Sequence, residues 1–439
     1  VIYCDIKEQI HLSLGANVNE MVITWATLCR SESAYVQYGN ESFNGVVTGI
    51  SSKFVDGGRQ KRKIYIHRVI LRNLMEAKQY HYTCINDEYA SEKYSFTTLK
   101  DGSNWSPRFA IIGDLGLVNA LSLPLIAKEV SENRYDIIFH DGDLAYDLHS
   151  KNAKVGDAFL RLIEPVAAYV PYMTAPGNHE EKYNFSNYDN RFTMIDGKTG
   201  SKNNHFYSFN IGPAHIISFS TEFYYFTNYG SHQIRSQYEW LKNDLREANL
   251  PRNREKRPWI ITFGHRPMYC SNEKTECREM NNLVRKGIKQ IDKFNTWLYG
   301  IEDLFFEYGV DVSFWAHLHS YERLWPVYNH QVYNGSFNAP YTNPRAPVHI
   351  ITGYAVRHFK SFHSNHKRYL QGNDESSYKF IQNPLPWSAM RVSDYGYTRM
   401  TIVNKTDLVI DQVSATKGKV FDEIRIVKNF HGPYKKIIN

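Results

Sequence analysis

Five short segments of the chain each place a potential metal ligand directly after a small residue that follows an apolar run. They read Gly113-Asp114, Gly142-Asp143 with Tyr146 three positions later, Gly177-Asn178, Gly264-His265, and Ala316-His317-Leu318-His319. Carboxylate, phenolate and amide oxygens combined with imidazole nitrogens suit iron, zinc or manganese. Glycine allows the tight turn that brings such a ligand close to an ion. We therefore predict that Asp114, Asp143, Tyr146, Asn178, His265, His317 and His319 bind metal.

Each of these residues also has an ordinary structural interpretation when it is considered alone. An Asp or Asn at the end of a strand commonly caps a helix. His317 and His319 would lie on one face of a strand simply because strand side chains alternate. It is the recurrence of such residues at five strand ends that favours a metal site.

The predicted ligand set fits a pair of metal ions. Two ions about 3.5 to 4 Å apart can activate a water and neutralise phosphoryl oxygens during in-line displacement at phosphorus. A bridging carboxylate is required, and Asp143 is the candidate because it is central among the motifs. His179 is predicted to be catalytic, since a spare imidazole can orient a phosphate or protonate the leaving group. Asn178 and His179 are the predicted substrate-binding residues.

The predicted elements place these ligands at one edge of a sheet. Residues 10–98 show short alternating segments separated by Gly and Asn turns, which predicts a small β-sandwich, and residues 101–104 read as a linker. Strands and helices then alternate, which predicts an α/β domain. The strands are expected at 109–112, 137–139, 172–175, 259–263 and 312–315, and the helices at 121–131, 158–169, 233–248 and 294–308. A predicted hairpin at 206–219 indicates a mixed sheet, and three further strands are expected at 348–352, 397–403 and 408–413. Ligands collect beyond the carboxyl ends of strands in such folds.

Composition restricts the class of protein and its partners. A chain of 439 residues favours two or more domains, and 42% hydrophobic with 22% charged residues is globular composition. The net charge is +7, but the basic runs 59–63 and 252–257 read as solvated turns, so no nucleic-acid partner is predicted. No run of about 18 apolar residues occurs, so no membrane span is expected. Nothing in the sequence indicates the oligomeric state.

Several features favour the secretory route. The numbering begins with Val1, which favours removal of a signal peptide. Glycosylation triplets begin at Asn40, Asn104, Asn184, Asn334 and Asn404, and Pro107 lowers the expectation for Asn104. Secretion is therefore expected, and a lysosomal destination would look the same.

The five cysteines lack the close pairing of a zinc site. Cys270 and Cys277 share one polar loop and are predicted to form a disulfide. One of Cys4 and Cys29 is expected to pair with Cys84.

The motifs resemble those of the purple acid phosphatases, a branch of the calcineurin-like metallophosphoesterases. Their blocks GDxG, GDxxY, GNHE, xxxH and GHxH match this chain over nearly its whole length, as do the runs 264–270, 319–326 and 394–399 of the long animal form. The resemblance implies an αββα sandwich after a fibronectin-III-like domain, with boundaries at 1–100, 101–345 and 346–439. It also implies an acid phosphatase in which a metal-bound hydroxide attacks phosphomonoesters, and a phosphorylated small molecule or phosphoprotein as substrate.

By the same resemblance, each ion has its own ligands. Fe(III) would be held by Asp114, Asp143, Tyr146 and His319, and a divalent iron, zinc or manganese by Asp143, Asn178, His265 and His317. The phenolate of Tyr146 on ferric iron would make the protein purple.

The chain departs from the family pattern at three places. Ala316 replaces the usual glycine of the last block, which we expect to be mild. Residues 351–358 lack the small residues that commonly follow Thr-Gly, and this loop borders the substrate side. Residues 271–274 replace extra histidines of the plant members, so substrate contacts must differ there.

Two alternatives to a phosphomonoesterase stay open at this point. One is a phosphodiesterase or nucleotidase on the same scaffold. The other is a secreted binding protein that keeps the fold without turnover.

Overall fold

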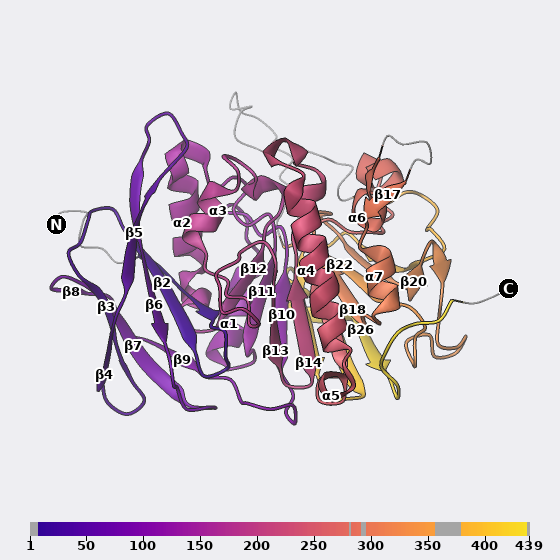
Figure 1. Cartoon of the computed structure of the whole chain (residues 1–439), viewed down its shortest axis with the longest axis horizontal. Coiled ribbons are helices and arrows are strands. Elements are labelled where there is room, and N and C mark those ends of the chain that lie inside the picture. The colour runs from indigo at the N-terminus through magenta and orange to yellow at the C-terminus, as the bar shows by residue number, and fades with distance from the viewer. Residues whose placement is uncertain (1–7, 281, 291–295, 356–378, 437–439) are drawn as a thin grey trace.

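The chain folds into an N-terminal β-sandwich packed beside a larger α/β sandwich (Figure 1). The structure is a computed structural model that describes residues 8–280, 282–290, 296–355 and 379–436. One sheet of the N-terminal sandwich has the order β1 (Glu8–Leu14), β2 (Met21–Thr27), β6 (Lys63–Leu71), β5 (Ile50–Val55). The other contains β4 (Gly45–Thr48), β3 (Ala34–Gly39), β7 (Gln79–Asn86), β8 (Tyr89–Ala90) and β9 (Tyr94–Thr97).

Two mixed sheets form the centre of the α/β sandwich. Among the described residues the first has six strands, in the order β12 (Tyr172–Ala175), β11 (Ile137–Asp141), β10 (Arg108–Ile112), β24 (Gly396–Ile402), β25 (Asp407–Ser414), β26 (Lys419–Val427). The second has seven, in the order β13 (Tyr207–Ile211), β14 (Ala214–Ser218), β15 (Trp259–Phe263), β18 (Val312–Trp315), β22 (Val348–Thr352), β19 (Tyr321–Leu324), β23 (Ser388–Val392). The segment after residue 346 therefore contributes strands to both sheets.

The parallel strands of the two sheets are buried on both faces. Every residue of β11, β15 and β18 is buried, as expected of parallel strands covered on both sides. The Phe139 and Phe263 rings stack at 3.8 Å between centroids, which joins the two sheets face to face. The mixed α/β sandwich predicted from the sequence is therefore present.

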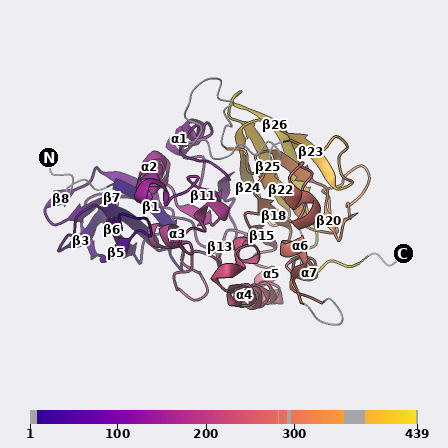
Figure 2. The same cartoon turned by 90° about the horizontal axis from the view of Figure 1, so that it is seen from above.

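Helices cover the outer faces of both sheets (Figure 2). The apolar sides of α1 (Leu123–Ser131) and α2 (Ser150–Ala167) bury Ile126 and Ile163 in the core of the first sheet. Those of α4 (His232–Ala248) and α7 (Glu302–Glu307) bury Leu241 and Phe305 against the second. Three short helices, α3 (Ser186–Arg191), α5 (Pro251–Arg254) and α6 (Asn282–Lys286), lie in connections, and no helix of the described residues is long and apolar enough to cross a membrane.

The helix predicted at 294–308 is only partly correct. Residues 291–295 lie outside the described part, and Trp297–Tyr299 form strand β17, which pairs antiparallel with β16 (Gly287–Lys289). The helix begins at Glu302. The apolar aromatic run Trp-Leu-Tyr fits either structure locally, and its pairing with a strand ten residues earlier decided between them. A second small ribbon pairs β20 (Val327–Tyr328) with β21 (Gln331–Val332).

The cysteines agree with one prediction and correct another. Cys270 and Cys277 form a disulfide, as predicted. Cys29 is also disulfide-bonded, but the expected pairing of Cys84 is wrong because Cys84 keeps a free thiol. Its side chain is fully buried in strand β7 within the core of the N-terminal sandwich. Of the predicted glycosylation sites, Asn184 and Asn404 are exposed, whereas Asn40 and Asn334 are half-buried.

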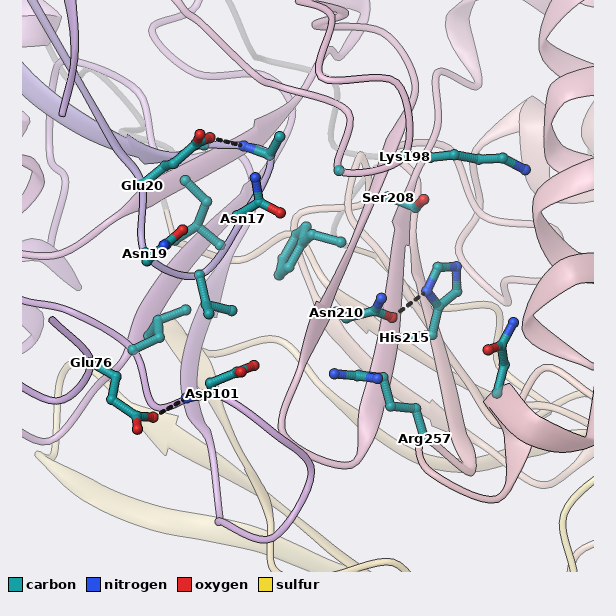
Figure 3. Close-up of a pocket in the computed structure, with 18 of the residues that line it drawn as sticks. Asn17, Asn19, Glu20, Glu76, Asp101, Lys198, Ser208, Asn210, His215 and Arg257 are labelled. Carbon is teal, nitrogen blue, oxygen red and sulfur yellow. Dashed lines mark hydrogen bonds between the residues drawn. The ribbon is translucent and has the colours of Figure 1, made fainter. Parts of the chain in front are cut away.

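Helix α2 joins the N-terminal sandwich to the α/β sandwich. Glu164 accepts hydrogen bonds from the Tyr94 hydroxyl at 2.6 Å and from the Ile10 backbone amide at 3.1 Å. Asp157 pairs with Arg62, which directly precedes β6, and with the buried Arg191. On another side of the junction a cavity of about 880 Å³ opens, with Glu20 and Glu76 facing His215 and Arg257 across it (Figure 3). None of the seven predicted metal ligands is among the described residues that line this cavity.

A buried charge network fixes the start of β18, the strand that leads to His317. The Asp311 carboxylate is fully buried and contacts the Lys428 ammonium, the Arg254 guanidinium at 3.4 Å and the Ile260 backbone amide at 2.8 Å. Burial opposes the charge of this carboxylate, but Lys428 and Arg254 outweigh it and hold the pKa of Asp311 well below its usual range. Because the folded-state pKa is lowered, this contribution to stability is present above the ordinary Asp pKa of about 3.9 and is lost only as the pH falls through the lowered value.

We expect Asp311→Ala to lower the free energy of unfolding by about 3–5 kcal/mol, because it leaves two buried cations without their counter-charge. Arg425→Ala is the control, since the Arg425 side chain is 62% exposed in its ion pair with Asp407 and its loss should cost less than about 1 kcal/mol. Denaturant titrations at pH 5 and pH 7 measure both effects. Equal losses in the two variants would contradict the role of the network.

Candidate metal centre

The predicted ligands lie at the carboxyl ends of five strands that belong to two facing sheets. Asp114 follows β10, Asp143 and Tyr146 follow β11, and Asn178 follows β12 in the first sheet, while His265 follows β15 and His317 and His319 follow β18 in the second. In each sheet these strands run parallel to one another. Their carboxyl ends therefore present all seven side chains at one edge of the sandwich.

One group of ligands gathers around Asp143. Single donor atoms of Asp143, His265 and His317 lie within 4.8 Å of one another, and all three residues are buried. Nε2 of His265 lies 3.3 Å from Oδ2 of Asp143. The Nδ1 atom of His265 contacts the Asp141 carbonyl oxygen at 2.8 Å, which fixes the ring and leaves Nε2 toward the carboxylate.

A second group gathers around Asp114. The Tyr146 hydroxyl lies 3.2 Å from Oδ1 of Asp114 and 2.6 Å from Nε2 of His319. That same imidazole nitrogen is 3.4 Å from Oδ1 of Asp114. Oδ2 of Asp114 accepts a hydrogen bond from the backbone amide of His317 at 2.8 Å, so the two groups are adjacent.

Unsatisfied polar atoms at this edge indicate room for ions. Oδ1 of Asn178, Nε2 of His265 and Nδ1 of His317 are buried and have no hydrogen-bond partner in the described part of the chain. Buried polar atoms normally have a partner, and exceptions call for an explanation such as a bound ion. The donor chemistry and these three orphaned atoms fit a metal centre.

The backbone at the ligands is strained in a way that supports a functional role. Four predicted ligands have left-handed φ values, which are 54° at Asp114, 49° at Asp143, 52° at Tyr146 and 69° at His317. Each such conformation costs about 1–3 kcal/mol and persists where the surroundings enforce it. Crowding is equally severe, since a Cβ on Gly177 would lie 2.3 Å from Oδ1 of Asp143. The surrounding structure therefore holds these turns in the conformation that places the predicted ligands.

Electrostatics at the two groups follow from burial and from neighbouring charge. Burial opposes protonation of His265, but the Asp143 carboxylate outweighs it and raises the pKa of His265 to about 10. Burial, Arg266 and Lys274 together hold the pKa of His317 well below its usual range, which keeps it in the neutral form that can bind a metal. Burial and the carboxylates of Asp114 and Asp143 raise the pKa of the Tyr146 phenol, and a bound cation would reverse that effect.

His179 stands beside the ligands without belonging to either group. Its Nδ1 lies 2.9 Å from Oδ1 of Asp147, and its Nε2 lies 3.9 Å from Oδ2 of Asp143. Burial lowers the pKa of His179, but Asp143 and Asp147 outweigh it and raise the value to about 9. The side chain is about one quarter exposed, so it can reach a molecule in solution.

Sequence reasoning assigned no role to several residues that organise this edge. Glu180 is buried, and its carboxylate accepts hydrogen bonds from the backbone amides of Asp143, Leu144 and Gly177 at 2.9, 3.0 and 2.9 Å. The available signal was its place in the Gly-Asn-His-Glu run, directly after two predicted site residues. Asp147 directly follows Tyr146, but its pairing with His179 gave no local signal.

The residues of the loop that follows His265 differ in what they contact. Asn272 is buried and donates to Ser320 at 3.1 Å, whereas Lys274 reaches His317 at 2.9 Å. Tyr269 is buried and bonds to Glu302, so it does not approach a substrate. Of the loop at 351–358, residues 356–358 lie outside the described part of the chain.

Comparisons with known proteins agree with this geometry. Residues 107–321 match the calcineurin-like phosphoesterase family, residues 7–98 match the purple acid phosphatase N-terminal domain, and residues 372–423 match the iron/zinc purple acid phosphatase-like C-terminal family. The chain is 49% identical to acid phosphatase type 7 of Mus musculus and 48% identical to that of Homo sapiens, over 97% of this chain and 92% of each relative. A purple acid phosphatase from yellow lupin seeds shares the fold, with a TM-score of 0.74 at 21% identity over 98% of this chain and 76% of the lupin chain.

We expect Gly177→Ala to weaken metal retention by about 10–100-fold, because the added Cβ displaces the Asp143 carboxylate. Gly200→Ala is the control: its φ of 68° strains an Ala there, but the added Cβ would meet only Ala16, at 3.9 Å, and no predicted ligand. Elemental analysis after dialysis against a chelator measures the ions retained per chain. Equal retention in the two variants would show that the crowding at Gly177 does not matter.

Proposed function

Because this chain belongs to the purple acid phosphatases, and is an acid phosphatase that hydrolyses phosphomonoesters, we propose a residue-level account of its site. In this proposal Asp114, Asp143, Tyr146 and His319 hold Fe(III), and Asp143, Asn178, His265 and His317 hold a divalent iron, zinc or manganese. The supporting observation is the division of the side chains into one group around Asp114 and another around Asp143. When bound, the two ions supply a nucleophilic water in acid and neutralise charge on the phosphoryl oxygens.

Asp143 is suited to bridge the two groups. Its Oδ1 atom accepts a hydrogen bond from the His179 backbone amide at 2.9 Å, and its backbone amide donates to Glu180 at 2.9 Å. These two contacts orient the carboxylate, and its Oδ2 atom faces His265. One oriented carboxylate between the groups keeps both ligand sets at a constant separation.

His179 is proposed as the residue that binds phosphate and protonates the leaving group. Asp147 receives its Nδ1–H, which orients the ring and stabilises the imidazolium form. A protonated imidazole with an exposed face carries both the positive charge that attracts phosphate and the proton that a departing alkoxide needs. Asn178, the preceding residue, would contact the same phosphate.

The proposed substrates are phosphorylated small molecules or phosphoproteins. We propose that the protein acts outside the cell or in the lysosome, and that Asn40, Asn184, Asn334 and Asn404 are glycosylated. The disulfide between Cys270 and Cys277 supports an oxidising destination. Mass spectrometry of the protein from a secreting host before and after glycosidase treatment tests the glycans.

The purified protein is expected to be violet, to contain two metal ions per chain and to hydrolyse an aryl phosphate monoester fastest below neutral pH. Elemental analysis, the visible spectrum and a phosphoester panel across pH measure these properties. A preference for diesters or nucleotides would favour the phosphodiesterase alternative. Good metal occupancy with no hydrolysis of any phosphoester would favour a binding role.

Asp143→Ala and His179→Asn are expected to fail in different ways. Loss of the Asp143 carboxylate should abolish retention of both ions. The His179 variant should keep both ions and lose about 10²–10⁴-fold in kcat, because only proton transfer and phosphate orientation are removed. Metal content and kcat are measured on the same samples, and equal metal loss in the two variants would contradict these roles.

A further inference from the structure

The loop closed by the Cys270–Cys277 disulfide lies directly against His317. Within it, the Lys274 ammonium lies 2.9 Å from Nε2 of His317, and Oε1 of Glu276 lies 3.4 Å from the same nitrogen. Both side chains are mostly buried, with 16% and 23% of their surface exposed. The loop therefore places one cation and one carboxylate beside the same nitrogen of His317, a proposed metal ligand.

A third charged group meets the same imidazole nitrogen. Nη1 of Arg266 lies 3.0 Å from Nε2 of His317 and 2.9 Å from Oε1 of Glu276. The Nε atom of this guanidinium contacts both carboxylate oxygens of Glu222, at 3.1 and 3.0 Å. Glu222 thus fixes the position of Arg266, and Glu276 balances the charge of Arg266 beside His317.

The chemistry of imidazole decides what these contacts do. A neutral imidazole binds a metal through one nitrogen only while the other nitrogen holds the proton. Nδ1 of His317 is the orphaned atom, so metal binding there requires a proton on Nε2 and an acceptor beside it. Within the described part of the chain, three groups contact Nε2: Arg266 and Lys274 are donors, and only Glu276 can accept.

We propose that Glu276 is a positioning residue that holds His317 in its metal-binding tautomer, and that Lys274 opposes it. This inference rests on the proposed function, in which His317 binds the divalent ion. Metal-binding histidines commonly donate their second N–H to a carboxylate, which fixes the ring and raises its basicity as a ligand. The Lys274 ammonium and the Arg266 guanidinium both point at the same nitrogen, so both favour the tautomer with the proton on Nδ1 and weaken metal binding.

The disulfide and its surroundings keep the loop in register with His317. The Ser271 backbone amide donates to Glu322 at 3.0 Å, and the Asn272 side chain donates to Ser320 at 3.1 Å. Ser320 and Glu322 lie one and three residues after His319, so the loop is anchored next to the proposed ligands His317 and His319. The Cys277 backbone amide donates to the Lys274 carbonyl oxygen at 3.0 Å, which closes the turn that bears Lys274 and Glu276.

Release of Zn²⁺ from the holoenzyme tests this assignment. The iron-containing protein is loaded with Zn²⁺ as the divalent ion and mixed with a colorimetric chelator in a stopped-flow instrument. Glu276→Gln should release Zn²⁺ about 10–100-fold faster than the unchanged protein. Lys274→Met should release it about two- to fivefold more slowly, because one opposing charge is removed. Glu273→Gln is the matched control, since it makes the same change on an exposed residue of the same loop and should leave the rate unchanged.

A double variant separates positioning from a general structural defect. Combining Lys274→Met with Glu276→Gln should bring the release rate back toward that of the unchanged protein, which a damaged loop would not do. Equal rates for Glu276→Gln and Glu273→Gln would overturn the inference. If Glu276→Gln does not fold, an unchanged or faster rate in Lys274→Met alone would overturn it. An unchanged protein that does not hold Zn²⁺ beside iron would overturn the proposed dinuclear centre, and this inference with it.

Discussion

The turns after β10, β11, β12, β15 and β18 must bend within one or two residues so that side chains from two sheets can meet. The backbone meets this requirement through glycine and through left-handed φ values at Asp114, Asp143, Tyr146 and His317. These turns are unfavourable in isolation. They persist because the surrounding structure enforces them. The strands on both sides are buried, and the Glu180 carboxylate accepts hydrogen bonds from three backbone amides of the turns.

Contacts away from the site hold the strands that bear the predicted ligands in position. The Asp311 network holds the start of β18, and the stacked Phe139 and Phe263 rings fix the distance between the two sheets. Helix α2 in turn ties the N-terminal sandwich to the first sheet through Asp157 and Glu164. The ligands therefore stand on strands whose opposite ends and faces are all packed, as a site that needs accurate geometry requires.

Much of this arrangement could be predicted because its signals are local. Apolar strands that end in glycine and a potential ligand predict both the sheet and the candidate site, since parallel strands bring their carboxyl ends together. The helix expected at 294–308 was only partly correct, because the Trp297–Tyr299 run pairs with β16, a contact that local sequence does not show. The predicted disulfide of Cys84 was wrong for a similar reason. The burial of Cys84 in the core depends on how the two sheets of the N-terminal sandwich pack together, which local sequence does not show.

The residues around the ligands were harder to predict than the ligands themselves. Asp147, Glu222 and Glu276 act on His179, Arg266 and His317 across separations of 32, 44 and 41 residues. A charged residue on a loop is usually solvated, so its type alone gives no indication of such a role. Only the folded chain shows that these carboxylates are directed inward at particular imidazole and guanidinium nitrogens.

The proposed ligand sets also imply that metal binding and folding are coupled. Each set draws on both sheets, since Asp143 follows β11 of the first sheet and His265 and His317 follow β15 and β18 of the second. An ion held between them resists separation of the sheets, because the unfolded chain has no preformed site to compete for it. A ligand present at 100 times its dissociation constant adds about 2.7 kcal/mol to stability, which is comparable to the strain of one or two left-handed turns. The ions thus offset part of the cost of the turns that create their own site.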